Sequence, residues 1–308
     1  MHDDELVVTD DVVRALIDRQ LPRFSALPLT RLPSSGSSNV LSRLGDDLLV
    51  RLPRQPGGSS AIDKEAKYLP LIASAISVQL PVIVAVGEPD LDYPERWSVL
   101  RWINGQTPVA PVPPGPDATG LALDLAAVVA ELRAAVVPRA AHADPALSSY
   151  RGGPIRAIDT GVRQYLAGCR ALGDLQLDFD ACDRFWTEAM SVPEPPSDSA
   201  PRWIHADLLA ENVLLRGGRL AAILDFGGLA LGDPSVDLIA AWELLNAEDR
   251  AIFRSTLDID DAEWERGRAW AFAIAVMTFP YYWHTLTQRC AHRLGMVHAV
   301  LHDHATEP

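Results

Sequence analysis

The sequence predicts an α+β protein of two lobes, with a β-rich N-terminal lobe and a mainly helical C-terminal lobe. Short β-prone runs fill the first hundred residues, and apolar residues recur at helical spacing through most of the rest. A proline-rich stretch, TPVAPVPPGPD, lies between the two regions at 107–117. We therefore expect an N-terminal lobe at residues 1–103 and a C-terminal lobe at residues 104–308.

The first predicted element is a helix that precedes the β-prone runs. Thr9 is a suitable cap, Val12, Val13 and Leu16 fall on one face, and Pro22 marks the end. The β-prone runs are Leu29–Leu32, Asn39–Leu44, Asp47–Leu52, Val82–Val86 and Trp97–Ile103. A short helix at Asp63–Leu69, ending near Pro70, is expected between the third and fourth runs.

In the C-terminal lobe, helical periodicity dominates. The predicted helices are Thr119–Leu132, Ile155–Leu172, Phe179–Met190, Val236–Leu245 and Glu263–Val276. One segment differs, because Asn212–Leu215 and Leu220–Leu224 are β-like runs joined by Arg-Gly-Gly-Arg. This pattern predicts a β-hairpin inside the helical lobe.

Composition limits the classes of partner. The chain of 308 residues has a formal net charge of −14, which disfavours nucleic acid and is compatible with a cationic small molecule. Cys169, Cys182 and Cys290 show no metal or disulfide spacing, so we expect reduced thiols. The longest mostly apolar run, Ala269–Trp283, is short for a membrane span and contains Pro280. The first ten residues lack an apolar segment, so we expect a cytoplasmic protein without a membrane partner.

The predicted hairpin is flanked by the residues with the clearest chemical signal. His205 and Asp207 precede it, Asn212 begins it, and Asp225-Phe226-Gly227 follows it. Phosphoryl transfer needs a carboxylate to orient or deprotonate the attacking hydroxyl, and oxygen ligands that hold Mg²⁺ against the nucleotide phosphates. Asp207 suits the first role, and Asn212 with Asp225 suits the second, because a hairpin returns the chain to its starting end.

Each of these residue types is common singly in loops and turns, so their order and spacing carry the prediction. For His205 we expect a structural role, in which the imidazole hydrogen-bonds backbone and braces the loop.

The segment IHADLLAENVLLRGGRLAAILDFGGLALGDPSVDL, residues 204–238, resembles the aminoglycoside phosphotransferases. These share a two-lobed, protein-kinase-like fold with choline kinases and macrolide phosphotransferases. The resemblance implies that Asp207 is the catalytic base or orients the hydroxyl, and that Asn212 and Asp225 ligate Mg²⁺. It also implies that Asp237 hydrogen-bonds the catalytic loop.

The N-terminal lobe resembles the same family around its first strands. The segment SSGSSNVLSRLGDDLLVRLPR looks like the nucleotide-covering hairpin and the strand after it. The residues expected over the phosphates are Ser35, Gly36, Ser37 and Ser38. Arg51 stands where kinases place a phosphate-binding lysine, and Glu65 matches its helix glutamate. The segment WSVLRWING looks like the linker that reads the adenine edge, so the backbones of Arg101 and Ile103 are candidate contacts.

The family resemblance predicts a phosphotransferase that uses ATP or GTP and Mg²⁺ on a hydroxyl of an aminoglycoside-like, cationic substrate. Acidic residues near 258–265 are candidates to face that substrate, although Asp260 and Glu263 also fit a helix cap. The aromatic run Tyr281–Thr287 leaves open a macrolide, choline, sugar or homoserine acceptor. A kinase-like binding protein without catalysis and a metallohydrolase centred on His205 are the remaining alternatives.

Overall fold

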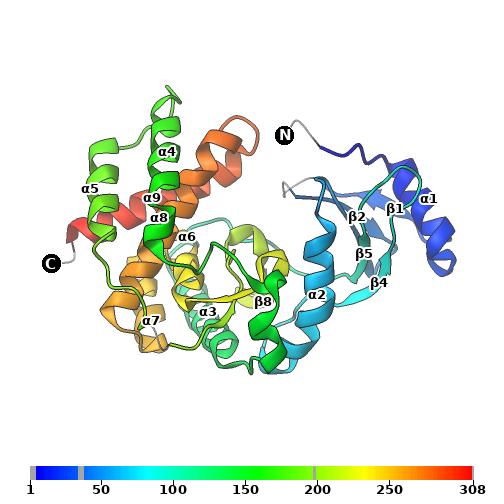
Figure 1. The fold of residues 1–308 in the computed structure, drawn as a ribbon, viewed down its shortest axis with the longest axis horizontal. Coiled ribbons are helices and arrows are strands. Elements are labelled where there is room, and N and C mark those ends of the chain that lie inside the picture. The colour runs from blue at the N-terminus through cyan, green and yellow to red at the C-terminus, as the bar shows by residue number, and fades with distance from the viewer. Residues whose placement is uncertain (1–4, 34–37, 197–198, 307–308) are drawn as a thin grey trace.

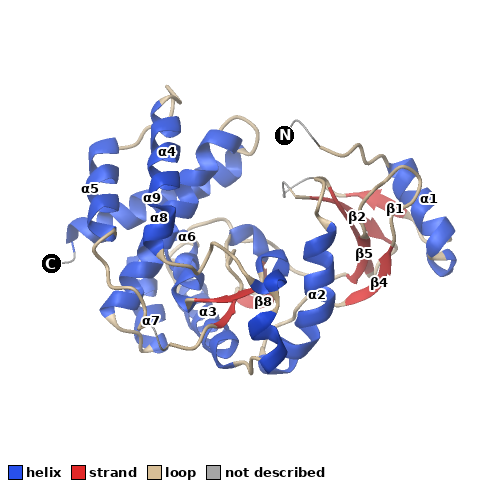
Figure 2. Ribbon diagram, viewed as in Figure 1, coloured by secondary structure: helices blue, strands red, loops and turns tan. Residues whose placement is uncertain are grey.

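The computed structural model describes residues 5–33, 38–196 and 199–306. Within these ranges the chain forms a β-rich lobe and a mainly helical lobe, with α2 standing between them (Figure 1). The strands gather in the N-terminal lobe, apart from short pairs within the helical lobe (Figure 2). This is the arrangement predicted from the sequence, and the two-lobed α+β fold class is confirmed.

The elements up to the inter-lobe segment are α1 (Asp10–Gln20), β1 (Leu29–Arg31), β2 (Asn39–Leu44), β3 (Leu48–Pro53), α2 (Ser59–Ile72), β4 (Ile83–Gly87) and β5 (Trp97–Arg101). Their strands form an antiparallel sheet in the order β1-β2-β3-β5-β4.

The helices of the second lobe are α3 (Pro116–Ala134), α4 (Asp159–Arg170), α5 (Phe179–Ala189), α6 (Ile239–Leu244), α7 (Ala247–Leu257), α8 (Asp261–Tyr282) and α9 (Thr287–Thr306). Its strands are β6 (Arg202–Ile204), β7 (Val213–Arg216), β8 (Arg219–Ile223) and β9 (Ala230–Gly232), where β6 pairs with β9 and β7 with β8.

Helix α1 begins as the sequence predicts, because the Thr9 side chain accepts a hydrogen bond from the Val12 amide at 3.2 Å. The buried face of α1, with Leu16 and Ile17, joins Val50 and Trp97 in the core of the first lobe. Burial of this apolar stripe fixes α1 against the sheet.

Helix α2 belongs to both lobes. Its Glu65 faces Arg51 of the sheet, whereas Tyr68, Leu69 and Ile72 are part of the larger core of the second lobe. The predicted helix was too short at both ends, because α2 runs from Ser59 to Ile72 through Pro70. Pro70 removes one backbone donor near the end of the helix, where few helical bonds remain to be lost. The lobe boundary between residues 103 and 104 stays a prediction.

The predicted hairpin is confirmed as β7 and β8. Arg216 pairs with Arg219, and the two residues between them, Gly217 and Gly218, have φ values of 58° and 75°. Two successive positive φ angles are the geometry of a type I′ turn, which side chains disfavour and glycine permits. The turn therefore returns the chain so that the start of β7 lies beside the end of β8.

Helices α7 and α9 were missed, and α8 extends beyond the predicted segment to include Pro280. The buried face of α9 contains the charged residues Arg293 and Asp303 among apolar ones, so it lacks a continuous apolar stripe. Among the described residues, no helix combines the length and the hydrophobicity that crossing a lipid bilayer requires.

The three cysteines are buried and unbonded to one another. Burial raises the pKa of Cys169 and of Cys182 to about 12 and that of Cys290 to about 11. A raised pKa reduces the thiolate fraction on which alkylation depends.

We therefore expect alkylation of the native protein by iodoacetamide at pH 8 to be slower than that of the unfolded chain by on the order of 100-fold. Mass spectrometry of timed samples, native and in urea, measures the two rates. Rapid labelling of any one thiol in the native protein would contradict the burial of that residue.

Candidate active site

The loop before the β7–β8 hairpin is held by a buried carboxylate. Asp237 accepts hydrogen bonds from the amides of His205 at 2.8 Å and of Ala206 at 2.7 Å. Ala206 has a φ of 65°, a left-handed conformation that is unfavourable for a residue with a side chain. The two bonds to Asp237 hold the loop in this conformation, and the predicted contact between Asp237 and the loop is confirmed.

His205 braces the loop from the other side. Its Nδ1 lies 3.2 Å from the Asp207 amide and accepts that bond, which leaves Nε2–H to donate to the Leu224 carbonyl at 2.9 Å. The imidazole is buried and stacks edge-on against Phe226, with ring centroids 4.5 Å apart. The predicted bracing role is confirmed, since both ring nitrogens are used by backbone groups.

Asp207 lies at the surface of the cleft, and its side chain is 31% exposed. Asn212 Nδ2 donates to the Asp207 Oδ2 at 2.9 Å, and the Arg151 guanidinium forms an ion pair with Oδ1. Desolvation raises the pKa of Asp207, but the charge and hydrogen bond of Arg151 outweigh it, so the pKa is below its ordinary value. Asp207 is therefore an oriented carboxylate that is ionised at neutral pH.

The hairpin brings Asn212 and Asp225 together as predicted. The Leu224 amide donates to the Asn212 carbonyl at 2.8 Å, which places the next residue, Asp225, beside Asn212. Asp225 has a φ of 54°, and its Oδ1 accepts a bond from the Gly227 amide at 3.3 Å. Because the Asn212 Nδ2 bonds Asp207, the Asn212 Oδ1 is the amide atom left to ligate a cation.

Arg51 of β3 and Glu65 of α2 form the predicted pair. Arg51 Nη1 donates to Glu65 Oε1 at 3.0 Å, the second nitrogen bonds the other oxygen, and Nε lies 3.3 Å from the Ser98 hydroxyl. Burial alone would lower the pKa of Arg51, but the Glu65 carboxylate reverses the direction and raises it. The bidentate pair therefore keeps the Arg51 guanidinium charged and fixes its position at the back of the cleft.

These groups meet at one cavity of about 310 Å³ between the lobes. Of the predicted site residues, the cavity is lined by Ser38, Arg51, Arg101, Ile103, Asp207, Asn212 and Asp225. Glu65 lies behind Arg51, is fully buried and does not itself line the cavity. Ser35, Gly36 and Ser37 lie outside the described residues.

Three residues of the site were not predicted: Arg151, Glu211 and Arg289. Glu211 and Arg289 line the inter-lobe cavity, and Arg289 Nε is 3.1 Å from the Glu211 carboxylate. Arg289 belongs to α9, which was not recognised as a helix, and Arg151 lies in a loop without a motif. Of these three residues, only Glu211 could have been found from the sequence, because it adjoins Asn212 in the motif.

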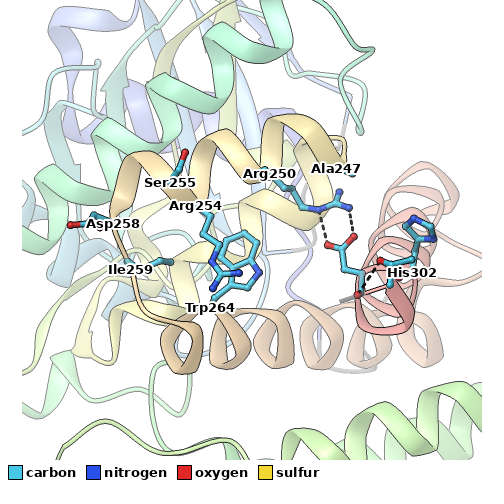
Figure 3. A pocket seen from close by; sticks show the side chains of 11 residues that line it. Ala247, Arg250, Arg254, Ser255, Asp258, Ile259, Trp264 and His302 are labelled. Atoms are coloured by element: carbon cyan, nitrogen blue, oxygen red, sulfur yellow. Dashed lines mark hydrogen bonds and ion pairs between the residues drawn. The ribbon is translucent and has the colours of Figure 1, made fainter. Parts of the chain in front are cut away.

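A larger cavity, of about 500 Å³, lies away from these residues between α7, α8 and α9 (Figure 3). There Arg254 extends over the Trp264 ring, and Arg250 pairs with Asp303. None of the predicted site residues lines this cavity. The nearby Asp260 caps α8 by accepting a bond from the Glu263 amide at 2.7 Å, so the expected cap is confirmed.

In the part of the chain that the structure describes, no group of three or more histidine, cysteine, aspartate or glutamate side chains is placed to hold a metal ion. Cation binding at Asn212 and Asp225 would therefore need further oxygen ligands from a bound molecule, such as the phosphates of a nucleotide.

The two lobes, with paired carboxylate and amide groups in the cleft between them, define a kinase-like phosphotransferase. Residues 29–270 match the model of the phosphotransferase enzyme family. Because this match spans most of the 308 residues, the chain belongs to that family. Comparison with curated protein sequences gave no match.

Solved structures of antibiotic phosphotransferases share the fold. The GDP complex of aminoglycoside 2'-phosphotransferase-IIIa aligns with a TM-score of 0.68 and 20% identity, over 96% of this chain and 100% of that one. The streptomycin–ATP complex of APH(2")-IIa aligns with a TM-score of 0.63 and 15% identity, over 95% and 99%. Macrolide 2'-phosphotransferase MphH from Brachybacterium faecium aligns with a TM-score of 0.58 and 20% identity, over 97% and 98%. Both antibiotic classes are thus represented among proteins of this fold.

The Asp237 carboxylate gives a prediction about loop stability. Asp237→Ala leaves two buried amides without acceptors, so we expect it to lower the free energy of unfolding by on the order of 3 kcal/mol. Asp237→Asn is the matched control, because it retains one acceptor oxygen and should lose less. Urea unfolding followed by circular dichroism measures both, and equal stability of the Ala variant and the wild type would contradict this role.

Proposed function

We propose that this chain transfers the γ-phosphoryl group of ATP or GTP to a hydroxyl of an aminoglycoside-like antibiotic, with Mg²⁺ as the cofactor. The observation that carries the proposal is the single cavity lined by Arg51, Asp207, Asn212 and Asp225. A cationic group, a hydroxyl-orienting carboxylate and two oxygen ligands for a cation are the parts that phosphoryl transfer requires.

The first lobe is proposed to bind the nucleotide. Arg51 would pair with phosphate oxygens, and Ser35 to Ser38 would cover the phosphates with backbone amides. The Arg101 amide already donates to the Val82 carbonyl at 2.9 Å, so its own carbonyl is the group proposed to accept from the base. The Ile103 amide would donate to the base beside it. Both residues line the cavity.

Asn212 Oδ1 and the Asp225 carboxylate are proposed to hold Mg²⁺, together with phosphate oxygens. Their fit rests on the amide orientation of Asn212 and on the closeness of the two residues across the hairpin. The bound ion would neutralise charge on the phosphates during transfer.

Asp207 is proposed to accept a hydrogen bond from the attacking hydroxyl and to take its proton as the new bond forms. Each carboxylate oxygen has two lone pairs, so Asp207 can accept this bond while it remains paired with Arg151 and Asn212. The lowered pKa makes Asp207 a weak base. Asp207 would therefore orient the hydroxyl before the reaction and take its proton only late, as the bond to phosphorus forms.

The acceptor is proposed to enter through a second cavity of about 270 Å³, which shares Thr107, Glu211 and Arg289 with the nucleotide cavity. Threonines from 285–287, within the aromatic run noted in the sequence, form part of its wall. The net charge of −14 favours a cationic acceptor at long range. Arg289 beside Glu211 offsets negative charge locally, which favours a less charged alcohol, such as a macrolide or sugar, as the second candidate.

We expect nucleotide-dependent phosphorylation of one acceptor class when Mg-ATP and Mg-GTP are tested with aminoglycosides, macrolides, choline, sugars and homoserine. Asp207→Asn should lower kcat by about 10² to 10⁴-fold, because it removes the proton acceptor but keeps the shape of the side chain. Nucleoside diphosphate release and mass spectrometry of the acceptor measure transfer. Nucleotide binding with no transfer to any acceptor would favour the alternative of an inactive kinase-like protein.

Removal of divalent cations with EDTA should abolish transfer, and added Mg²⁺ should restore it. Asp225→Ala should lower kcat by on the order of 100-fold or more, since it removes a charged group that acts on the phosphates in the transition state. Asp258→Asn is the control, because Asp258 lies at the larger cavity and has no part in the proposed site. Full activity of Asp225→Ala at low Mg²⁺ would exclude Asp225 as a ligand of Mg²⁺.

A further inference from the structure

Arg151 reaches the active site from outside the catalytic loop. It lies in the loop at 148–154, between the 3₁₀ turns Pro145–Leu147 and Ile155–Ile158. One nitrogen, Nη1, donates to the Ala206 carbonyl at 2.8 Å and also pairs with the Asp207 carboxylate. The same guanidinium therefore grips both the backbone and the side chain of the loop that presents Asp207.

The guanidinium has a further partner in its own loop. Arg151 Nε lies 3.1 Å from the Tyr150 hydroxyl, and the arginine side chain is 26% exposed. Tyr150 is 56% exposed, so this contact orients the Arg151 side chain without burying it.

The backbone of this loop is fitted closely to the second lobe. The Asp233 amide donates to the Gly152 carbonyl at 2.8 Å, and Gly152 has a φ of 76°. A Cβ at Gly152 would lie 2.4 Å from the Ile204 side chain, so a larger residue does not fit. The position of Arg151 is thus constrained by its neighbour in the chain, whose backbone is bonded to the second lobe.

We propose that Arg151 is a positioning residue of the transfer reaction, which fixes the orientation of the Asp207 carboxylate toward the acceptor hydroxyl. Arg151 engages Oδ1 and Asn212 engages Oδ2, so the plane of the carboxylate is fixed at both ends. This inference rests on the proposed function, because an oriented Asp207 matters only if that carboxylate meets an acceptor.

The contact between Arg151 and Asp207 could also serve as a latch or as an anchor, and each of these roles predicts a different effect of removing Arg151. If Arg151 were a latch that occupies Asp207 until the acceptor arrives, its removal would raise kcat. If Arg151 only anchored the loop at 148–154, its removal would lower stability and leave the dependence of kcat on Asp207 unchanged. A positioning role predicts lower kcat with an unchanged KM for the nucleotide, because Arg151 does not line the nucleotide cavity.

The test compares Arg151→Met and Arg151→Lys with the wild type, using an acceptor on which the wild type is active. We expect Arg151→Met to lower kcat by about 10 to 100-fold with the nucleotide KM unchanged, since misplaced catalytic groups cost rates of this order. Arg151→Lys should recover part of the rate, and millimolar guanidinium should raise the rate of the Met variant. Arg163→Met is the matched control, because Arg163 is an exposed arginine of α4 that pairs with Asp159 and lines neither of the two cavities of the proposed site.

Combining Arg151→Met with Asp207→Asn separates positioning from anchoring. If Arg151 acts through Asp207, the double variant is no slower than Asp207→Asn alone, whereas independent roles multiply the two losses. Thermal unfolding of each variant corrects kcat for any unfolded fraction. An unchanged or higher kcat of Arg151→Met, or multiplied losses in the double variant, would overturn the inference while wild-type transfer upholds the proposed function. Absence of transfer by the wild type would instead overturn the proposed function and the inference with it.

Discussion

The candidate active site depends on one buried carboxylate. Asp237 stabilises the left-handed backbone at Ala206, and that turn directs His205 inward and Asp207 outward. His205 then fixes Leu224, which lies next to Asp225. Two hydrogen bonds to a side chain far along the sequence thus set the positions of His205 and Asp207 and, through Leu224, the end of β8 next to Asp225. A conformation that costs energy locally persists because the surrounding structure determines it.

The Arg51–Glu65 pair joins β3 to α2 within the first lobe, and its purpose is different. Removing two charges from water carries a desolvation cost that their attraction offsets only in part, so such a pair is weak grounds for stability. Its value lies in placing a positive charge that survives at any physiological pH. Since Glu65 is on α2, the position of this charge depends on how that helix packs against the core of the second lobe.

Much of the fold and the centre of the site follow from the sequence. Capping by Thr9 and the Gly217-Gly218 turn are local rules, and the hairpin spacing brings Asn212 beside Asp225. Local rules fail where the partner is remote. Arg151 meets Asp207 across 56 positions, and α9 buries Arg293 against carboxylates that only the folded chain supplies. A buried helix face that contains ion pairs lacks the periodic pattern of apolar residues from which a helix is predicted.

The position of α2 between the sheet and the core of the second lobe limits how the protein can be dissected. A fragment that ended at the inter-lobe segment would keep the sheet and the Arg51–Glu65 pair but would present Tyr68, Leu69 and Ile72 to water. An exposed apolar patch of this kind promotes association between chains. The β-rich lobe is therefore a poor candidate for an autonomous nucleotide-binding module, and grafting it onto another protein would require a redesigned lower half of α2.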